Sequence, residues 1–185
     1  MKSKAIAFGL AVATLWVTPG AAPAASARSI PDVTVLFKRA VTLVHRTHRP
    51  TFSHAVMYEA DGLPRGNRGT TSAQGIVRWQ FVLRNSGRRF HSVTVTYGPP
   101  PAGFGRVTGQ PGFVLEDVVI PAAPKMTLAR AVSLLRRAGH RRPFFNVTLR
   151  NPLGPKRLNP LYIFGFPGRS FIAVDTVTGR VRPIH

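Results

Sequence analysis

Four residues in the first half of the chain are of types that bind metal ions. They are His45, His48, His54 and Glu59. Imidazole nitrogens and carboxylate oxygens are common ligands of zinc. Arg46 and Arg49 flank the first two histidines, however, and their positive charge would repel a divalent cation. We therefore predict no metal site and no cofactor.

The acidic residues are too few and too scattered to predict a hydrolase. They are Asp32, Glu59, Asp61, Glu116, Asp117 and Asp175. A catalytic triad needs a carboxylate that orients a histidine beside a nucleophile, but no serine lies in a Gly-x-Ser-x-Gly motif and the chain has no cysteine. The glycine-rich segments match neither a phosphate-binding loop nor a dinucleotide fingerprint. We expect no enzymatic activity.

Three of the acidic residues are expected to have structural rather than catalytic roles. Glu116 and Asp117 are adjacent in an extended run over 113–120, so one of them must share a face with apolar residues. We expect that carboxylate to pair with an arginine, and the alternative is a recognition acid for a basic peptide. Asp175 precedes a Thr-Val-Thr-Gly turn and is predicted to stabilise it.

The strongest candidate site is a pair of basic turns, one after each predicted helix. The first contains Arg46, His48 and Arg49, and the second contains Arg136, Arg137, His140, Arg141 and Arg142. Guanidinium groups bind phosphate and carboxylate, so these turns predict two anion-binding patches that could hold two points of one polymer. Complementation of two helix dipoles by the same charges remains the alternative.

A second, weaker candidate is the segment 60–75, whose glycines and prolines interrupt any periodicity. This composition predicts a long exposed loop. Arg65 and Arg68 near its middle make it a candidate binding loop.

The chain begins with the features of a secretory signal peptide. Lys2 and Lys4 precede an apolar stretch over 5–17, and Ala25-Ser26-Ala27 offers a cleavage site. We expect residues 1–27 to be removed, the protein to be secreted to the extracellular space, the periplasm or the cell envelope of a bacterium, and the mature chain to lack a transmembrane segment.

The net charge is +20, from 26 Lys and Arg against 6 Asp and Glu. Such a charge favours anionic partners, namely cell-envelope polymers, lipid headgroups or an acidic protein. Compositional bias of a GC-rich genome remains the alternative explanation. Trp79 and Phe81 alternate on a predicted core face, so nucleic acid is expected only as a non-specific electrostatic ligand.

Hydrophobic periodicity predicts two helices and several strands. The helices cover 32–47 and 128–138, the second with Thr127 as its N-cap and Gly139 at its C-terminal end. The strands are predicted from alternation and turn signals. Their ranges are 51–59, 76–84, 90–97, 113–120, 143–150, 160–166, 169–175 and 180–182.

The two helices belong to an internal repeat. Arg39 to Arg46 returns as Arg130 to Arg137, with five of eight positions identical. The repeat predicts an α+β fold of two helix-plus-three-stranded antiparallel units. We expect a signal peptide over 1–27, a first unit over 28–97, a Pro/Gly-rich linker with an extra strand over 98–126, and a second unit over 127–185.

The second unit closes on Val174-Asp175 and Thr178-Gly179 before a last strand. This ending resembles that of a PepSY domain, the type found in peptidase propeptides. The resemblance covers Thr127 to Ile184 and, through the repeat, Asp32 to Tyr97, although the first copy lacks the Asp and Thr-Gly ending. It implies tandem PepSY-like domains, which act in exported proteins as inhibitory or interaction modules without catalysis.

We therefore expect a secreted, non-catalytic binding protein. One hypothesis is a protein-interaction or peptidase-inhibitor-like module whose partner is an extracellular protein. The alternative is an envelope-associated protein that binds anionic polymers or lipid headgroups through the repeated basic turns. High salt should weaken only the second.

Overall fold

The computed structural model describes residues 30–47, 51–87, 89–111, 117–154 and 159–184. In these ranges two helices and nine strands form a mixed α+β fold. The helices are α1 (Val33–Thr47) and α2 (Leu128–Arg137). The strands are β1 (Val56–Pro64), β2 (Ile76–Arg84), β3 (Ser92–Gly98), β4 (Gly103–Phe104), β5 (Thr108–Gln110), β6 (Asn146–Arg150), β7 (Leu161–Phe166), β8 (Ser170–Asp175) and β9 (Val181–Ile184).

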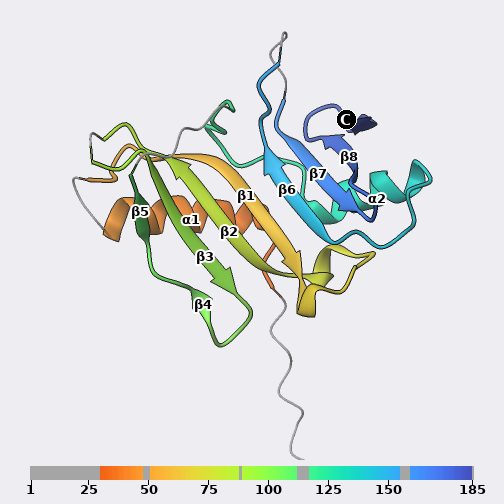
Figure 1. Ribbon diagram of the computed structural model, residues 1–185, viewed down its shortest axis with the longest axis horizontal. Coiled ribbons are helices and arrows are strands. Elements are labelled where there is room, and N and C mark those ends of the chain that lie inside the picture. The colour runs from red at the N-terminus through yellow and green to blue at the C-terminus, as the bar shows by residue number, and fades with distance from the viewer. Residues whose placement is uncertain (1–29, 48–50, 88, 112–116, 155–158, 185) are drawn as a thin grey trace, which may run out of the picture.

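All strands belong to one antiparallel sheet, which runs through both halves of the chain (Figure 1). The order is β4-β3-β2-β1-β6-β7-β8-β9, and β5 also pairs with β3. The halves join where β1 pairs with β6, with Ala60 opposite Leu149 and Asp61 opposite Thr148. The two halves therefore share a sheet instead of sitting apart on a linker.

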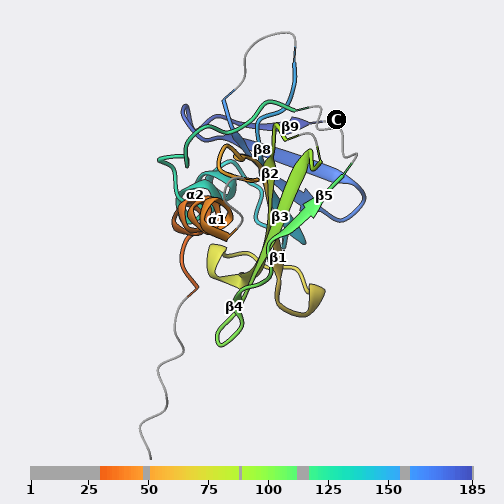
Figure 2. The same cartoon turned by 90° about the vertical axis from the view of Figure 1, so that its left-hand side faces the viewer.

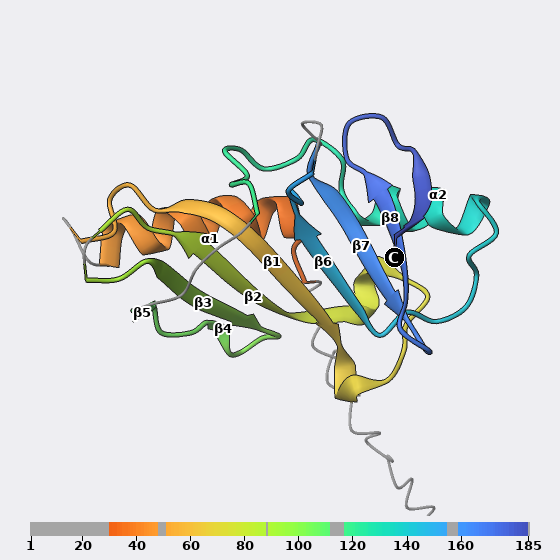
Figure 3. The ribbon, with the colours of Figure 1, turned by 45° about the horizontal axis from the view of Figure 1, so that its top comes forward.

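Both helices cover the same face of this sheet (Figure 2). They lie end to end along it, α1 over the first half and α2 over the second (Figure 3). One continuous core joins the layers, because Val44 of α1, Leu135 of α2, Phe81 of β2 and Tyr162 of β7 belong to a single buried cluster. The other face of the sheet, called the helix-free face below, carries no α-helix in the described residues.

Each helix buries one stripe against the sheet, as its periodicity predicts. The buried positions are Val33, Leu36, Phe37, Ala40 and Val44 in α1, and Leu128, Ala131, Val132 and Leu135 in α2. The predicted cap is confirmed, since the Thr127 hydroxyl oxygen accepts a hydrogen bond from the Arg130 amide at 3.2 Å. Gly139 takes φ +92° after α2, as expected for a helix C-terminal glycine. No helix among the described residues is long and apolar enough to cross a membrane.

Asp32 joins the N-termini of the two helices. Its Oδ1 accepts a hydrogen bond from the Thr34 amide at 3.0 Å, and its Oδ2 accepts one from the Leu128 amide, also at 3.0 Å. A carboxylate satisfies unpaired amides at a helix N-terminus and complements the helix dipole there. Because the two N-termini meet at Asp32, the C-terminal ends of α1 and α2 point to opposite ends of the molecule (Figure 1).

The first predicted strand was displaced. The structure places residues 51–54 in a turn and starts β1 at Val56. Phe52 is nevertheless buried and packs against Phe90, with ring centroids 5.8 Å apart. The alternation that indicated a strand therefore reflects a buried turn residue.

The predicted loop over 60–75 was wrong for its first five residues, which continue β1 to Pro64. They pair with β2 on one side, and part of the segment pairs with β6 on the other. Gly62 belongs to this central strand because Trp79 lies against it: an added Cβ would lie 2.8 Å from the Trp79 ring and from Ile76 Cγ2. The glycine thus serves close packing and does not mark a turn.

The linker over 98–126 contributes β4 and β5 to the sheet edge, which its composition did not predict. Residues 113–116 of the predicted extra strand, including Glu116, lie outside the described residues. In the part that is described, Val118 forms only an isolated bridge with Asn151. The expected pairing of Asp117 with an arginine is confirmed, because its carboxylate contacts the Arg150 guanidinium.

The turn after β8 also matches its prediction. Asp175 Oδ1 accepts hydrogen bonds from the Val177 and Thr178 amides, each at 2.8 Å. Burial alone would raise the pKa of Asp175, but these amides and Asn159 lower it below its ordinary value. Gly179 takes φ +73°, as the turn requires.

Candidate anion-binding site

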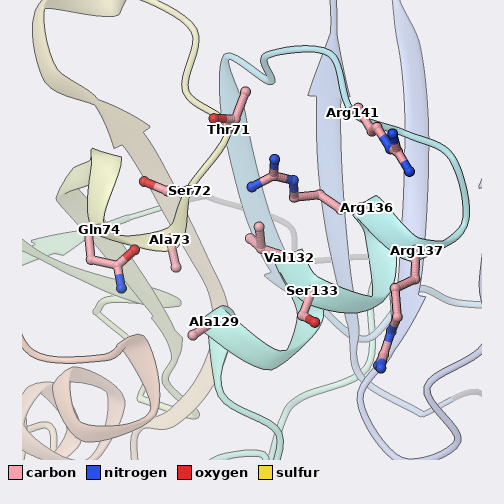
Figure 4. A pocket seen from close by; sticks show the side chains of 10 residues that line it. All are labelled: Thr71, Ser72, Ala73, Gln74, Ala129, Val132, Ser133, Arg136, Arg137 and Arg141. Carbon is pink, nitrogen blue, oxygen red and sulfur yellow. The ribbon is translucent and has the colours of Figure 1, made fainter.

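A cavity of about 530 Å³ lies between α2 and the loop that precedes β2 (Figure 4). The helix and the turn after it provide one wall, and the loop provides the other. The lining residues are Thr71, Ser72, Ala73, Gln74, Ala129, Val132, Ser133, Arg136, Arg137 and Arg141. Three of them are arginines and none is acidic.

The helical wall follows from the amphipathic pattern of α2. Because Leu128, Ala131 and Leu135 point into the core, the opposite face of the helix carries exposed Ser133, Arg136 and Arg137. Figure 4 shows the Arg136 side chain extending toward Thr71, while Arg137 points away along the outer side of the helix.

The loop wall is held in place by its own hydrogen bonds. Thr70 and Phe144 form an isolated bridge, with both N–H···O bonds at 2.9 Å. The Ser72 hydroxyl accepts a hydrogen bond from the Gly75 amide at 3.3 Å. An added Cβ at Gly75 would lie 2.0 Å from Thr70 Oγ1, so only glycine fits beside this threonine. The bridge brings residues 71–74 next to α2 although they are far apart in the chain.

The cavity is electropositive. No carboxylate among the described residues pairs with Arg136, Arg137 or Arg141. The nearby carbonyls at the end of α2 offset part of this charge, but three arginines and no acidic residue line the same space. Hydroxyls of Thr71 and Ser133 and the Gln74 amide provide neutral hydrogen-bond donors beside them. The arrangement can bind an oxyanion such as phosphate or carboxylate.

The structure brings together only part of the second predicted patch. Arg136, Arg137 and Arg141 line the cavity, whereas Arg142 is exposed outside its lining. His140 is half-buried, with its ring centroid 6.4 Å from that of Phe166. The three arginines therefore form the candidate site, and the rest of the turn does not.

The first predicted patch lies elsewhere. Arg46 lines a separate hollow of about 340 Å³ on α1, together with Lys38, Arg39, Thr42 and Leu43. His48 and Arg49 lie outside the described residues. The neighbouring His45, considered above as a metal ligand, has its Nε2 2.8 Å from the Ala55 carbonyl oxygen. The described residues contain no group of three or more His, Cys, Asp or Glu placed to hold a metal ion.

Arg65 and Arg68 are exposed and do not line the cavity on α2. Residues 71–74 of the same segment line the cavity instead, and the sequence did not identify them as candidates. The only signal was the polar run Thr70-Thr71-Ser72 before a predicted strand.

A group of acidic residues occupies the opposite, helix-free face of the sheet. Glu59 and Asp61 alternate with buried Ala60 along β1 and so point away from the core. The Thr148 hydroxyl donates to Asp61 Oδ1 at 2.7 Å, and Glu59 Oε2 lies 3.9 Å from Arg150 Nε. Burial, a hydrogen bond to Asp61 and the charge of Asp61 raise the pKa of Glu59 to about 8, against a smaller opposing effect of Arg150. The acids are therefore separated by the sheet from the arginine cavity.

No protein-family model, curated protein sequence or solved structure matches this chain.

Proposed function

We propose that this protein is an exported, non-catalytic binding protein that holds an anionic group in the cavity on α2. The ligand belongs to the cell envelope, as an anionic polymer or a lipid headgroup. The observation that carries the proposal is that Arg136, Arg137 and Arg141 line one hollow whose lining contains no acidic residue. A high net charge alone would distribute basic side chains over the whole surface. Here three arginines line a single cavity.

The expected affinity is moderate and salt-dependent. Each arginine is exposed, and exposed ion pairs contribute about 0.2–1 kcal/mol each. Bidentate guanidinium contacts with phosphate or carboxylate are stronger than ordinary hydrogen bonds. Such contacts support binding at low salt and weaker binding at high salt.

We also propose that the fold arose from a duplicated α-β-β-β unit of PepSY-like type. In each half a helix precedes three consecutive strands, α1 with β1 to β3 and α2 with β6 to β8. The equivalent strands β1 and β6 pair antiparallel, and the equivalent helices meet at their N-termini. A twofold relation between two similar units would produce both features.

A second candidate function is protein interaction, including peptidase inhibition. It is favoured by the helix-free face of the sheet. Phe171, which is 39% exposed, lies on that face because it alternates along β8 with Ile172, a member of the core under the helices. Capture of one discrete extracellular protein that survives a wash at about 1 M salt, where the Debye length is ~3 Å, would support this function. Recovery of anionic polymer or lipid alone, released by that wash, would support the first.

The anion-binding proposal is tested by reversing two charges in the cavity. In Arg136→Glu/Arg141→Glu, affinity for inorganic polyphosphate should fall by roughly 10- to 100-fold, because attraction is lost and repulsion is added within the site. Isothermal titration calorimetry at low salt measures the change.

The matched control is Arg65→Glu/Arg68→Glu, which alters the net charge equally at exposed positions outside the cavity. This variant should lose no more than the small long-range contribution of net charge. Equal losses in the two variants would show that polyphosphate responds only to overall charge, and the proposed site would be wrong.

A further inference from the structure

A second cavity, of about 310 Å³, adjoins the arginine cavity. It lies where the two helix N-termini meet and shares three lining residues with the first cavity, Ala73, Gln74 and Ala129. Figure 4 shows these shared residues at the end of the arginine cavity opposite Arg141. The two cavities therefore border one another along a common wall.

The second cavity differs from the first in its chemistry. Its lining includes no lysine or arginine, and most of it is apolar. The apolar lining residues are Ile30, Pro31, Val33, Ala73, Ile76, Trp79, Leu128 and Ala129. A ligand portion that enters this space would contact mainly hydrocarbon and the Trp79 indole.

The polar side chains at the helix junction are already engaged. Both carboxylate oxygens of Asp32 accept hydrogen bonds, one from the Thr34 amide and one from the Leu128 amide. The Thr127 hydroxyl oxygen accepts a hydrogen bond from the Arg130 amide. These groups consequently have little hydrogen-bonding capacity left for a polar ligand, and the Asp32 charge disfavours a second anion there. A linear polyanion would find cations in the first cavity and none in the lining of the second.

Resting on the proposed anion-binding function, we infer that the ligand is an anionic amphiphile. Its phosphate or carboxylate headgroup binds Arg136 and Arg141, and its alkyl chain passes Ala129 to lie beside Trp79. An amphiphile fits both cavities, because arginines in the first complement a negative headgroup and the mainly apolar lining of the second accommodates an alkyl chain. Each cavity lies within the range of about 300–1,000 Å³ typical of small-molecule sites.

Alkyl phosphates of increasing chain length provide the test, each used below its micelle concentration. The chain contains two tryptophans, Trp16 and Trp79. Because Trp16 lies in the expected signal peptide over 1–27, Trp79 is the only tryptophan of the mature protein, which is used for the test. Affinity, measured by calorimetry, should rise about three- to fourfold for each added methylene from butyl to octyl phosphate, because each one leaves water. A nitroxide on the alkyl chain should quench Trp79 fluorescence more strongly than a nitroxide on the headgroup.

Two variants separate the contributions of the cavities. Arg136→Glu/Arg141→Glu should weaken all chain lengths alike. Ala129→Phe, which fills the wall shared by the two cavities, should remove the gain with chain length, so that butyl and octyl phosphate bind it with similar affinity. Ala138→Phe, at an exposed position of the α2 C-terminus outside both linings, is the control and should retain the gain.

The outcomes are distinct. If butyl phosphate fails to bind, the anion-binding function itself is wrong. If butyl phosphate binds but longer chains gain nothing, or if Ala129→Phe keeps the full gain, the amphiphile inference is overturned and the anion site stands. Parallel series of alkyl phosphates and fatty acids distinguish a phosphate headgroup from a carboxylate.

Discussion

Replacing Asp32 by alanine should lower the free energy of unfolding by about 2 kcal/mol, because one side chain caps two helices. Loss of a single N-cap typically costs about 1 kcal/mol, and here both the Thr34 and the Leu128 amides lose their acceptor. The Asp32 carboxylate also fixes the N-terminus of α2, and both proposed ligand cavities are lined in part by this helix. Urea unfolding followed by far-ultraviolet circular dichroism measures the loss.

Two further variants test the double-cap interpretation. Asp32→Asn keeps one oxygen acceptor but turns an NH₂ group toward the second amide, so its loss should be intermediate. Thr127→Ala removes only the cap at Arg130 and should cost about 1 kcal/mol. An Asp32→Ala loss no larger than that of Thr127→Ala would contradict the shared cap.

Stability should fall as the pH rises from about 4.5 to about 8, because folding raises the pKa of Glu59 across this range. Below pH 4.5 Glu59 is protonated in both the folded and the unfolded protein. Between the two values the unfolded chain releases its proton while the folded protein retains it, so raising the pH favours unfolding. The limiting slope is about 1.4 kcal/mol per pH unit. The groups that face Glu59 are Asp61 on its own strand, Asp117, and Arg150 of β6.

Glu59→Gln is the control, because glutamine keeps the size of the side chain and does not titrate. Its unfolding free energy should vary less with pH than that of the unaltered protein between pH 5 and 8. Taking the difference between the two proteins removes the contributions of all groups that the substitution leaves unaltered. In Asp175→Asn the slope of unfolding free energy against pH should differ from that of the unaltered protein only in the acidic range, because the lowered pKa of Asp175 stabilises the fold above that range and this stabilisation is lost as the pH falls. Identical pH profiles for Glu59→Gln and the unaltered protein would refute the assignment.

The helices and most strands could be predicted because local periodicity determines them. The buried stripes of α1 and α2 recur at helical spacing, and β2 matches its predicted range of 76–84. Pairing between distant strands leaves no such local pattern. The junction of β1 with β6, from Glu59 opposite Arg150 to Gly62 opposite Val147, joins residues about 90 positions apart in the chain. The last residues of β1 pair with the nearer strand β2, with Pro64 opposite Ile76.

For the candidate site, too, local sequence identified the residues but not their arrangement in space. Charge alone identified Arg136, Arg137 and Arg141 as candidates for anion binding. Selecting them from the other basic residues required the opposite wall, which the Thr70–Phe144 bridge brings into place. Composition could not locate this wall, because Thr71, Ser72 and Gln74 are common surface residues that gain a role only by their position.

The location of a bound anion tests the central claim most directly. The measurement is a two-dimensional ¹⁵N–¹H NMR titration with octyl phosphate at low salt. We expect the largest shifts in the amides of 71–74 and 129–141 and in the Trp79 indole. Shifts spread evenly over exposed arginines, or centred on the helix-free face around Asp61 and Arg150, would contradict it.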